Sequence, residues 1–233
     1  MLAGTVSGLT GFGLALISVP LLLFVYEPET VVVITAVLSV AINLAVVWDS
    51  WREADRRVVL GLLPPAFVGI FAGAEVLRVL DPLYIRLAVG VIVVFSALLL
   101  LRDIRIPGAH TRWATMISGS LSGALSTSTG LAGPPIVLLF ASRDLPKLSF
   151  RGSSAMYFLV LSVVGLFALY SRGLVEPREI PLSLGLIPAA LLGKAAGTAL
   201  LRRISERTFR LVALSVVILT GALGVATALR GLL

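Results

Sequence analysis

The sequence has 233 residues, of which 58% are hydrophobic and 13% are charged, and its mean hydropathy is +1.05. Soluble domains carry roughly 25% charged residues, so soluble enzymes and nucleic-acid-binding proteins fit this chain poorly. The net charge is +7, and the lysines and arginines lie between the apolar stretches. Cytoplasmic loops of membrane proteins are rich in these residues. The chain has no cysteine and a single histidine, His110, so we expect no metal site and no cofactor. The composition predicts an integral membrane protein embedded in the lipid bilayer.

Eight apolar segments are long enough to cross a bilayer, which takes about 20 residues. In chain order they are residues 2–25, 30–50, 58–77, 82–101, 113–142, 152–171, 180–201 and 208–229. Two of them, the first and the fifth, contain residues that interrupt helices, namely Gly4, Gly8, Gly11, Gly13 and Pro20 in one and the run 126–135 in the other. Because Gly and Pro are costly inside a helix, we expect both segments to be broken. The alternative is a kinked helix that packs closely through its small residues.

An internal repeat relates the two halves of the chain. Residues 61–95 align without gaps to residues 185–219, with 12 identities over 35 positions. The matches include the pairs Gly69 with Gly193 and Arg78 with Arg202, which are harder to obtain by chance than apolar matches. The sequence therefore predicts two homologous repeats, 1–106 and 107–233, each a broken segment followed by three helices. Many secondary transporters are built from such repeats.

The positive charges test how the chain crosses the membrane. If all eight segments cross, the loop and tail lysines and arginines divide equally between the two sides. If the two broken segments are instead re-entrant, thirteen lie on one side and five on the other. Because positive residues are concentrated in cytoplasmic loops, we expect re-entrant segments, inverted repeats, and cytoplasmic loops at 52–57, 102–112, 143–151 and 202–210. The fold class predicted is thus an all-α integral membrane protein.

Two glycine-rich motifs resemble those of the TauE/SafE family of sulfite exporters. The first is Gly8-x-x-Gly11-Phe12-Gly13 followed by Val19-Pro20, and the second is Gly119-x3-Gly123 followed by Gly130-x2-Gly133-Pro134-Pro135. The resemblance covers essentially the whole chain. It implies a multi-pass protein of the bacterial inner membrane that moves sulfite or organosulfonates such as sulfoacetate.

The broken segments also predict where an anion would bind. A half-helix that begins inside the membrane presents unpaired N–H groups and a partial positive charge. The binding residues predicted around the two breaks are Gly11, Phe12, Gly13, Ser126, Thr127, Ser128, Thr129, Gly130 and Gly133. The alternative for the four hydroxyls is that they bond back to carbonyls of their own helix.

Lys194 is the one cation well inside a predicted span, so it joins the predicted site, with snorkelling toward the interface as the alternative. Three further residues, Asn43, Glu75 and Arg151, are predicted as accessory to the site, and each has a purely structural alternative. Asn43 is either glue between helices or part of the site, and Glu75 either pairs with Arg78 or couples a proton. Arg151 either attracts anions or simply marks a cytoplasmic loop.

The function predicted is a secondary transporter of small sulfur-containing anions, held near the midplane by the ends of two broken helices. An anion channel and an intramembrane enzyme are the alternatives, and the enzyme is disfavoured because no histidine and no aspartate lies well inside a span. We expect a small anionic substrate, a coupling proton or sodium ion, no nucleic acid, and a homodimer as one oligomeric option.

Overall fold

The structure is a computed structural model that describes residues 1–101, 106–201, 203 and 205. Every regular element in these ranges is an α-helix, which confirms the all-helical prediction. The helices are α1 (Leu2–Thr10), α2 (Leu14–Leu22), α3 (Pro28–Ser50), α4 (Arg56–Val79), α5 (Pro82–Leu101), α6 (Arg112–Ser128), α7 (Gly133–Ser142), α8 (Lys147–Ser171) and α9 (Glu179–Leu201). The predicted segment 208–229 lies outside the described residues.

Four of these helices, α3, α4, α8 and α9, are long and apolar enough to cross a membrane. Helices α3 and α4 both start at residues that favour the beginning of a helix. Asp55 precedes α4 and accepts from the N–H groups of Arg57 (3.1 Å) and Val58 (3.2 Å), and α3 begins at a proline, Pro28. Helix α8 begins at Lys147, one and a third turns before the predicted start at residue 152.

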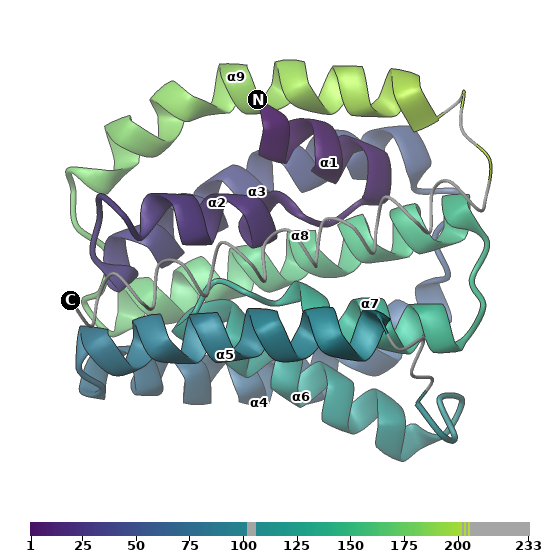
Figure 1. Ribbon diagram of the computed structural model, residues 1–233, viewed down its shortest axis with the longest axis horizontal. Helices are drawn as coiled ribbons and strands as arrows, with labels where there is room; N and C mark the ends of the chain where they lie inside the picture. The colour runs from purple at the N-terminus through teal and green to yellow at the C-terminus, as the bar shows by residue number, and fades with distance from the viewer. Residues whose placement is uncertain (102–105, 202, 204, 206–233) are drawn as a thin grey trace.

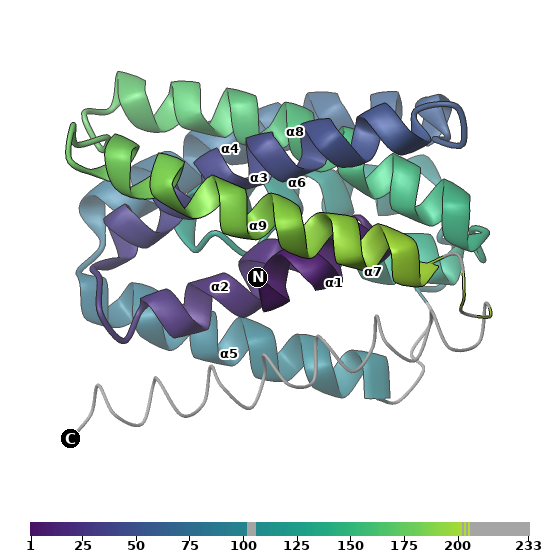
Figure 2. The ribbon, with the colours of Figure 1, turned by 90° about the horizontal axis from the view of Figure 1, so that it is seen from above.

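The two broken segments are each a pair of short helices, α1–α2 and α6–α7. Helices α3 and α8 pack against each other, and α8 lies on the side of the bundle opposite α5 (Figure 2). Figure 1 shows α5 along one face. Helix α6 packs against α4, and α1 packs against α9. The first helix of each broken segment therefore packs against a long helix from the other half of the chain. Helix α1 of the first half contacts α9 of the second, and α6 of the second half contacts α4 of the first.

Glycines allow these two helix pairs to approach backbone to backbone. In the α4–α6 pair, a Cβ on Gly123 would overlap the carbonyl of Ala66, and a Cβ on Gly69 would overlap the carbonyl of Ser120. The α1–α9 pair repeats this arrangement, with Gly4 facing the carbonyl of Ala190 and Gly193 facing that of Met1. Only glycine fits at such close approaches, so both short helices are held at fixed registers.

The segment α6–α7 is a hairpin whose two outer ends meet. Arg143, which follows α7, donates from Nε to the carbonyl of Ala109 (2.8 Å) and from Nη2 to Oγ1 of Thr115 (2.7 Å). The N–H of Ile106 donates to Oγ of Ser142 (2.9 Å). The chain thus enters the bundle through α6 and returns through α7 to the same end, at the right of Figure 1.

The described residues of three of the four loops predicted to be cytoplasmic, 52–57, 106–112 and 143–151, lie at this same end. Besides the contacts around Arg143, the N–H of Asp55 donates to Oγ of Ser153 (2.8 Å), which joins the loop after α3 to the start of α8. Most of the loop 202–210 lies outside the described residues.

Candidate functional site

The first break occupies residues 11–13, between α1 and α2. Gly11 (φ 78°) and Gly13 (φ 98°) both adopt the left-handed conformation that favours glycine. The hydroxyl of Thr10 lies 2.8 Å from the carbonyl of Val6, and it accepts from the N–H of Phe12 at 3.3 Å. Thr10 therefore ends α1 and also pairs the first N–H group beyond Gly11.

The second break, residues 129–132, repeats this geometry. The hydroxyl of Thr129 donates to the carbonyl of Leu125 (2.9 Å) and accepts from the N–H of Leu131 (3.3 Å). Gly130 follows with φ 76°. The two breaks are built from the same pair of residues, a threonine followed by a left-handed glycine.

A small cavity, which we call the central cavity, lies between the two breaks. Its volume is about 50 Å³, which is room for more than one water-sized group, since about 10–15 Å³ of such volume holds one water molecule. Helices α3 and α8 complete its wall. The lining residues are Ser7, Phe12, Gly13, Leu14, Ala15, Leu16, Val32, Thr35, Ala36, Ser39, Asn43, Ser126, Gly130, Ala132, Gly133, Phe158, Leu161 and Ser162.

Two polar groups of this wall are buried without a hydrogen-bond partner among the described residues. They are Oγ of Ser7, a residue only 1% exposed, and Oδ1 of Asn43, a residue 4% exposed. An unpaired buried polar group costs about 1–3 kcal/mol. A polar ligand in the central cavity that bonds to these groups would remove this cost, which makes the cavity a candidate binding site.

The breaks also bring two helix N-termini to the cavity. The first residues of α2, Leu14 to Leu16, line it, and the first N–H groups of a helix have no partner within the helix. Helix α7 begins with Gly133, Pro134 and Pro135, and the two prolines supply no N–H group. Both ends carry the partial positive charge of a helix N-terminus, but α2 supplies more hydrogen-bond donors.

The structure brings five of the ten predicted binding residues to the central cavity: Phe12, Gly13, Ser126, Gly130 and Gly133. The other five lie elsewhere. Gly11 packs against the backbone of Arg151, and Ser128 donates to the carbonyl of Ala124 (2.7 Å). Thr127 donates across to α4, to the carbonyl of Ile70 (2.7 Å), and Thr129 caps α6.

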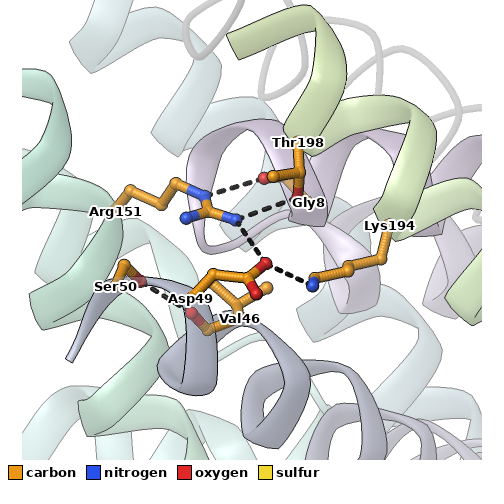
Figure 3. Close-up of polar contacts among 7 residues, drawn as sticks. All are labelled: Gly8, Val46, Asp49, Ser50, Arg151, Lys194 and Thr198. Atoms are coloured by element: carbon orange, nitrogen blue, oxygen red, sulfur yellow. Dashed lines mark hydrogen bonds and ion pairs between the residues drawn. The ribbon is translucent and has the colours of Figure 1, made fainter. Parts of the chain in front are cut away.

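Lys194 lies in a charged cluster at one end of the bundle, away from the lining of the central cavity (Figure 3). Its Nζ pairs with Oδ2 of Asp49. Arg151 is buried beside them and donates from Nε to the carbonyl of Gly8 (2.8 Å) and from Nη2 to Oγ1 of Thr198 (3.0 Å). Arg151 thereby satisfies a carbonyl at the C-terminal end of α1, which has no partner within the helix.

Glu75 also lies outside the central cavity. It pairs with Arg78, whose Nε donates to Oε1 at 3.1 Å, and with Arg172. The local ion pair with Arg78 is therefore present. Asn43, in contrast, lines the cavity, and its carbonyl oxygen Oδ1 is buried without a partner among the described residues.

The sequence analysis missed Ser7 and Thr10. The signal that could have found them is a second alignment, because Leu2, Gly4, Ser7, Thr10 and Gly11 recur as Leu121, Gly123, Ser126, Thr129 and Gly130. The offset here is 119 residues, five fewer than in the alignment of the long helices.

Comparison with known proteins agrees with the glycine motifs. The family model described as "Sulfite exporter TauE/SafE" matches residues 1–223. A relative from Cupriavidus necator (strain ATCC 17699 / H16), named "Probable sulfite/organosulfonate exporter TauE", is 23% identical over 220 residues, which cover 91% of this chain and 86% of the relative. No solved structure matches the chain. Because the family model spans nearly the whole sequence, the chain belongs to the TauE/SafE sulfite exporter family.

Proposed function

We propose that this protein is a secondary transporter that moves sulfite or a small organosulfonate across the bacterial inner membrane. The substrate anion binds in the central cavity, between the α1–α2 and α6–α7 breaks. Membership of the TauE/SafE family and the printed name of the Cupriavidus relative support the substrate class. They also favour a transporter over an enzyme.

The observation that carries the proposal is the pair of residues in the cavity wall with an unpaired polar atom, Ser7 and Asn43. The hydroxyl of Ser7 can donate to an anion, and the amide of Asn43 can donate through Nδ2 when a 180° turn of the amide exchanges it with Oδ1. Among the described residues, none of those that line the cavity is charged. An anion there would be stabilised by hydrogen bonds and by the N-terminus of α2, as at other helix N-termini that bind oxyanions. An uncharged site also holds the anion loosely enough to release it on the other side.

The proposal includes inverted repeats with re-entrant broken segments. Three features support it: the matching breaks at Thr10–Gly11 and Thr129–Gly130, the reciprocal packing of α1 with α9 and of α6 with α4, and the closed hairpin α6–α7. The end of the bundle that carries the loops around Arg52 and Arg143 faces the cytoplasm in this proposal, since those loops are rich in positive charge.

Uptake of labelled sulfite into proteoliposomes tests the site. Asn43→Leu should lower the initial rate by about tenfold or more, because a loss of roughly 1.4 kcal/mol in binding corresponds to tenfold. Ser7→Ala should lower it as well. Ser50→Ala is the matched control, since Ser50 is buried on the same helix as Asn43 but bonds to the carbonyl of Val46 outside the cavity. Wild-type rates in both folded cavity variants would refute the proposed site.

A further inference from the structure

A second, larger cavity opens at the end of the bundle where α3 ends and α8 begins, and we call it the vestibule. Its volume is about 940 Å³. The charged residues that line it are four basic and two acidic ones: Lys147, Arg151, Lys194, Arg203, Asp49 and Glu53. The vestibule therefore carries a net positive charge that attracts anions.

The carboxylate of Asp49 lies between two of these cations. Its Oδ2 atom pairs with Nζ of Lys194 and lies 3.8 Å from Nη2 of Arg151. Figure 3 shows both side chains pointing at this one carboxylate from two different helices. Two cations that converge on one oxygen form a site for an oxyanion, and here the chain supplies the oxyanion itself.

Arg151 is fixed in place without help from Asp49. Its side chain is 3% exposed, and its guanidinium is bonded to the carbonyl of Gly8 and to the hydroxyl of Thr198. The site would therefore keep its shape if the carboxylate moved away. A buried cation left without a counter-charge is strongly unfavourable, so another anion would have to take the place of Asp49.

Asp49 has room to move. Its side chain is 34% exposed, whereas that of Lys194 is 13% exposed. Asp49 also lies in the last turn of α3 and lines the vestibule. A change of side-chain rotamer would release the carboxylate into the open part of this cavity.

The other end of the bundle also holds a carboxylate that pairs with two cations, Glu75 with Arg78 and Arg172, but both arginines there are more exposed than Arg151 and Lys194. The alignments with offsets of 119 and 124 residues place Val32 opposite Arg151, Ala168 opposite Asp49, and Ile70 opposite Lys194. All three counterparts are aliphatic, so the internal repeat does not require Asp49, Arg151 and Lys194.

We propose that Arg151 and Lys194 form a second binding site for an oxyanion, which the carboxylate of Asp49 occupies in this structure. An anion of the sulfite or sulfonate class displaces Asp49 as it passes between the vestibule and the central cavity. The proposal rests on the proposed function for the identity of the anion, and on the geometry of the three residues for the site.

Equilibrium binding of labelled sulfite to the purified, detergent-solubilised full chain tests this site at constant ionic strength. All variants carry Asn43→Leu as well, which removes the contribution of the central cavity. Asp49→Asn should lower the Kd by about tenfold or more, because the competing carboxylate no longer occupies the site. Glu53→Gln is the matched control, because it removes a negative charge from the same vestibule but not from between the two cations; it should change Kd by less than about threefold. Equal effects of Asp49→Asn and Glu53→Gln would overturn the proposal.

The variant Lys194→Met provides a second test, which holds even if the Asp49→Asn variant does not fold. It should raise the Kd by about tenfold or more, because one of two converging cations is lost. Unchanged binding would overturn the site. These binding measurements are independent of transport. A protein that binds sulfite but does not transport it contradicts the proposed function. A protein that transports sulfite, but whose Kd does not change in the Asp49 and Lys194 variants, contradicts only the vestibular site.

Discussion

Thr10 and Thr129 hold equivalent positions in the two breaks of this fold. Each hydroxyl lies within hydrogen-bond distance of the carbonyl four residues earlier and accepts from the N–H group two residues later. Each is followed by a glycine in the left-handed conformation, Gly11 and Gly130. The same threonine hydrogen bonds therefore shape both breaks that precede the helix N-termini at the central cavity.

Removal of either hydroxyl should destabilise the protein, and removal of that of Thr10 should do so more. In Thr10→Val the N–H of Phe12 loses its acceptor, and a buried unpaired N–H costs about 1–3 kcal/mol. In Thr129→Val the N–H of Leu131 keeps the carbonyl of Leu125 as an acceptor (3.2 Å), so the loss should be smaller. Both variants should lower the midpoint of thermal unfolding in detergent. Thr5→Val is the control, since its hydroxyl donates to the carbonyl of Met1 and accepts from no N–H group of the described residues. An equal loss of stability in Thr5→Val would show that the breaks are not the cause.

The close helix pairs should be equally sensitive to added volume. Gly123→Ala and Gly4→Ala place a methyl group against the carbonyls of Ala66 and Ala190, and such overpacking costs about 1–3 kcal/mol or more. Both should reduce the yield of monodisperse protein and its unfolding midpoint. Gly185→Ala should not, because no atom lies within 4 Å of its added Cβ. A harmless Gly4→Ala would mean that α1 does not pack on α9 as described.

Single cysteines test the sidedness of the bundle, because the chain has none of its own. His110→Cys and Pro146→Cys both change exposed residues at the end where Arg143 joins α7 to α6, while Pro177→Cys changes an exposed residue at the other end. A membrane-impermeant maleimide should label the first two only from the cytoplasmic face and the third only from the outside. Labelling of His110→Cys and Pro146→Cys from opposite faces would contradict the re-entrant hairpin.

The positions of the breaks follow directly from local sequence. Gly11 and Gly13 are the residues that adopt positive φ in the first broken segment, and Gly130 does so in the second. Glycine is favoured there for steric reasons that do not depend on the rest of the fold. The long helices follow from apolar stretches of the right length, and Pro64 and Pro188 lie inside helices without ending them.

The direction in which side chains point is harder to predict from sequence. The four consecutive hydroxyls 126–129 cannot face one cavity, because successive residues of a helix point about 100° apart. Ser126 alone lines the central cavity, whereas Thr127 bonds to α4 and Ser128 bonds back within α6. A run of hydroxyls in a helix therefore predicts at most one or two groups at a site.

Contacts between residues that are distant in the sequence also could not be predicted from the sequence. Asp49 and Lys194 are 145 positions apart, and each by itself has an ordinary explanation, an interfacial acid and a snorkelling lysine. Only the fold shows that they face each other beside Arg151. Ser7 was overlooked because a lone serine among glycines carries no signal until the two breaks are aligned on Thr10 and Thr129.

Counterflow of labelled sulfite is the most direct test of the central claim. Liposomes containing the purified protein are loaded with unlabelled sulfite and diluted into a trace of labelled sulfite. We predict a transient accumulation of label above equilibrium that excess external sulfite abolishes and that Asn43→Leu largely removes, because a carrier exchanges anions through one binding site. Equilibration without accumulation would indicate a channel, and no flux above that of protein-free liposomes would contradict the account.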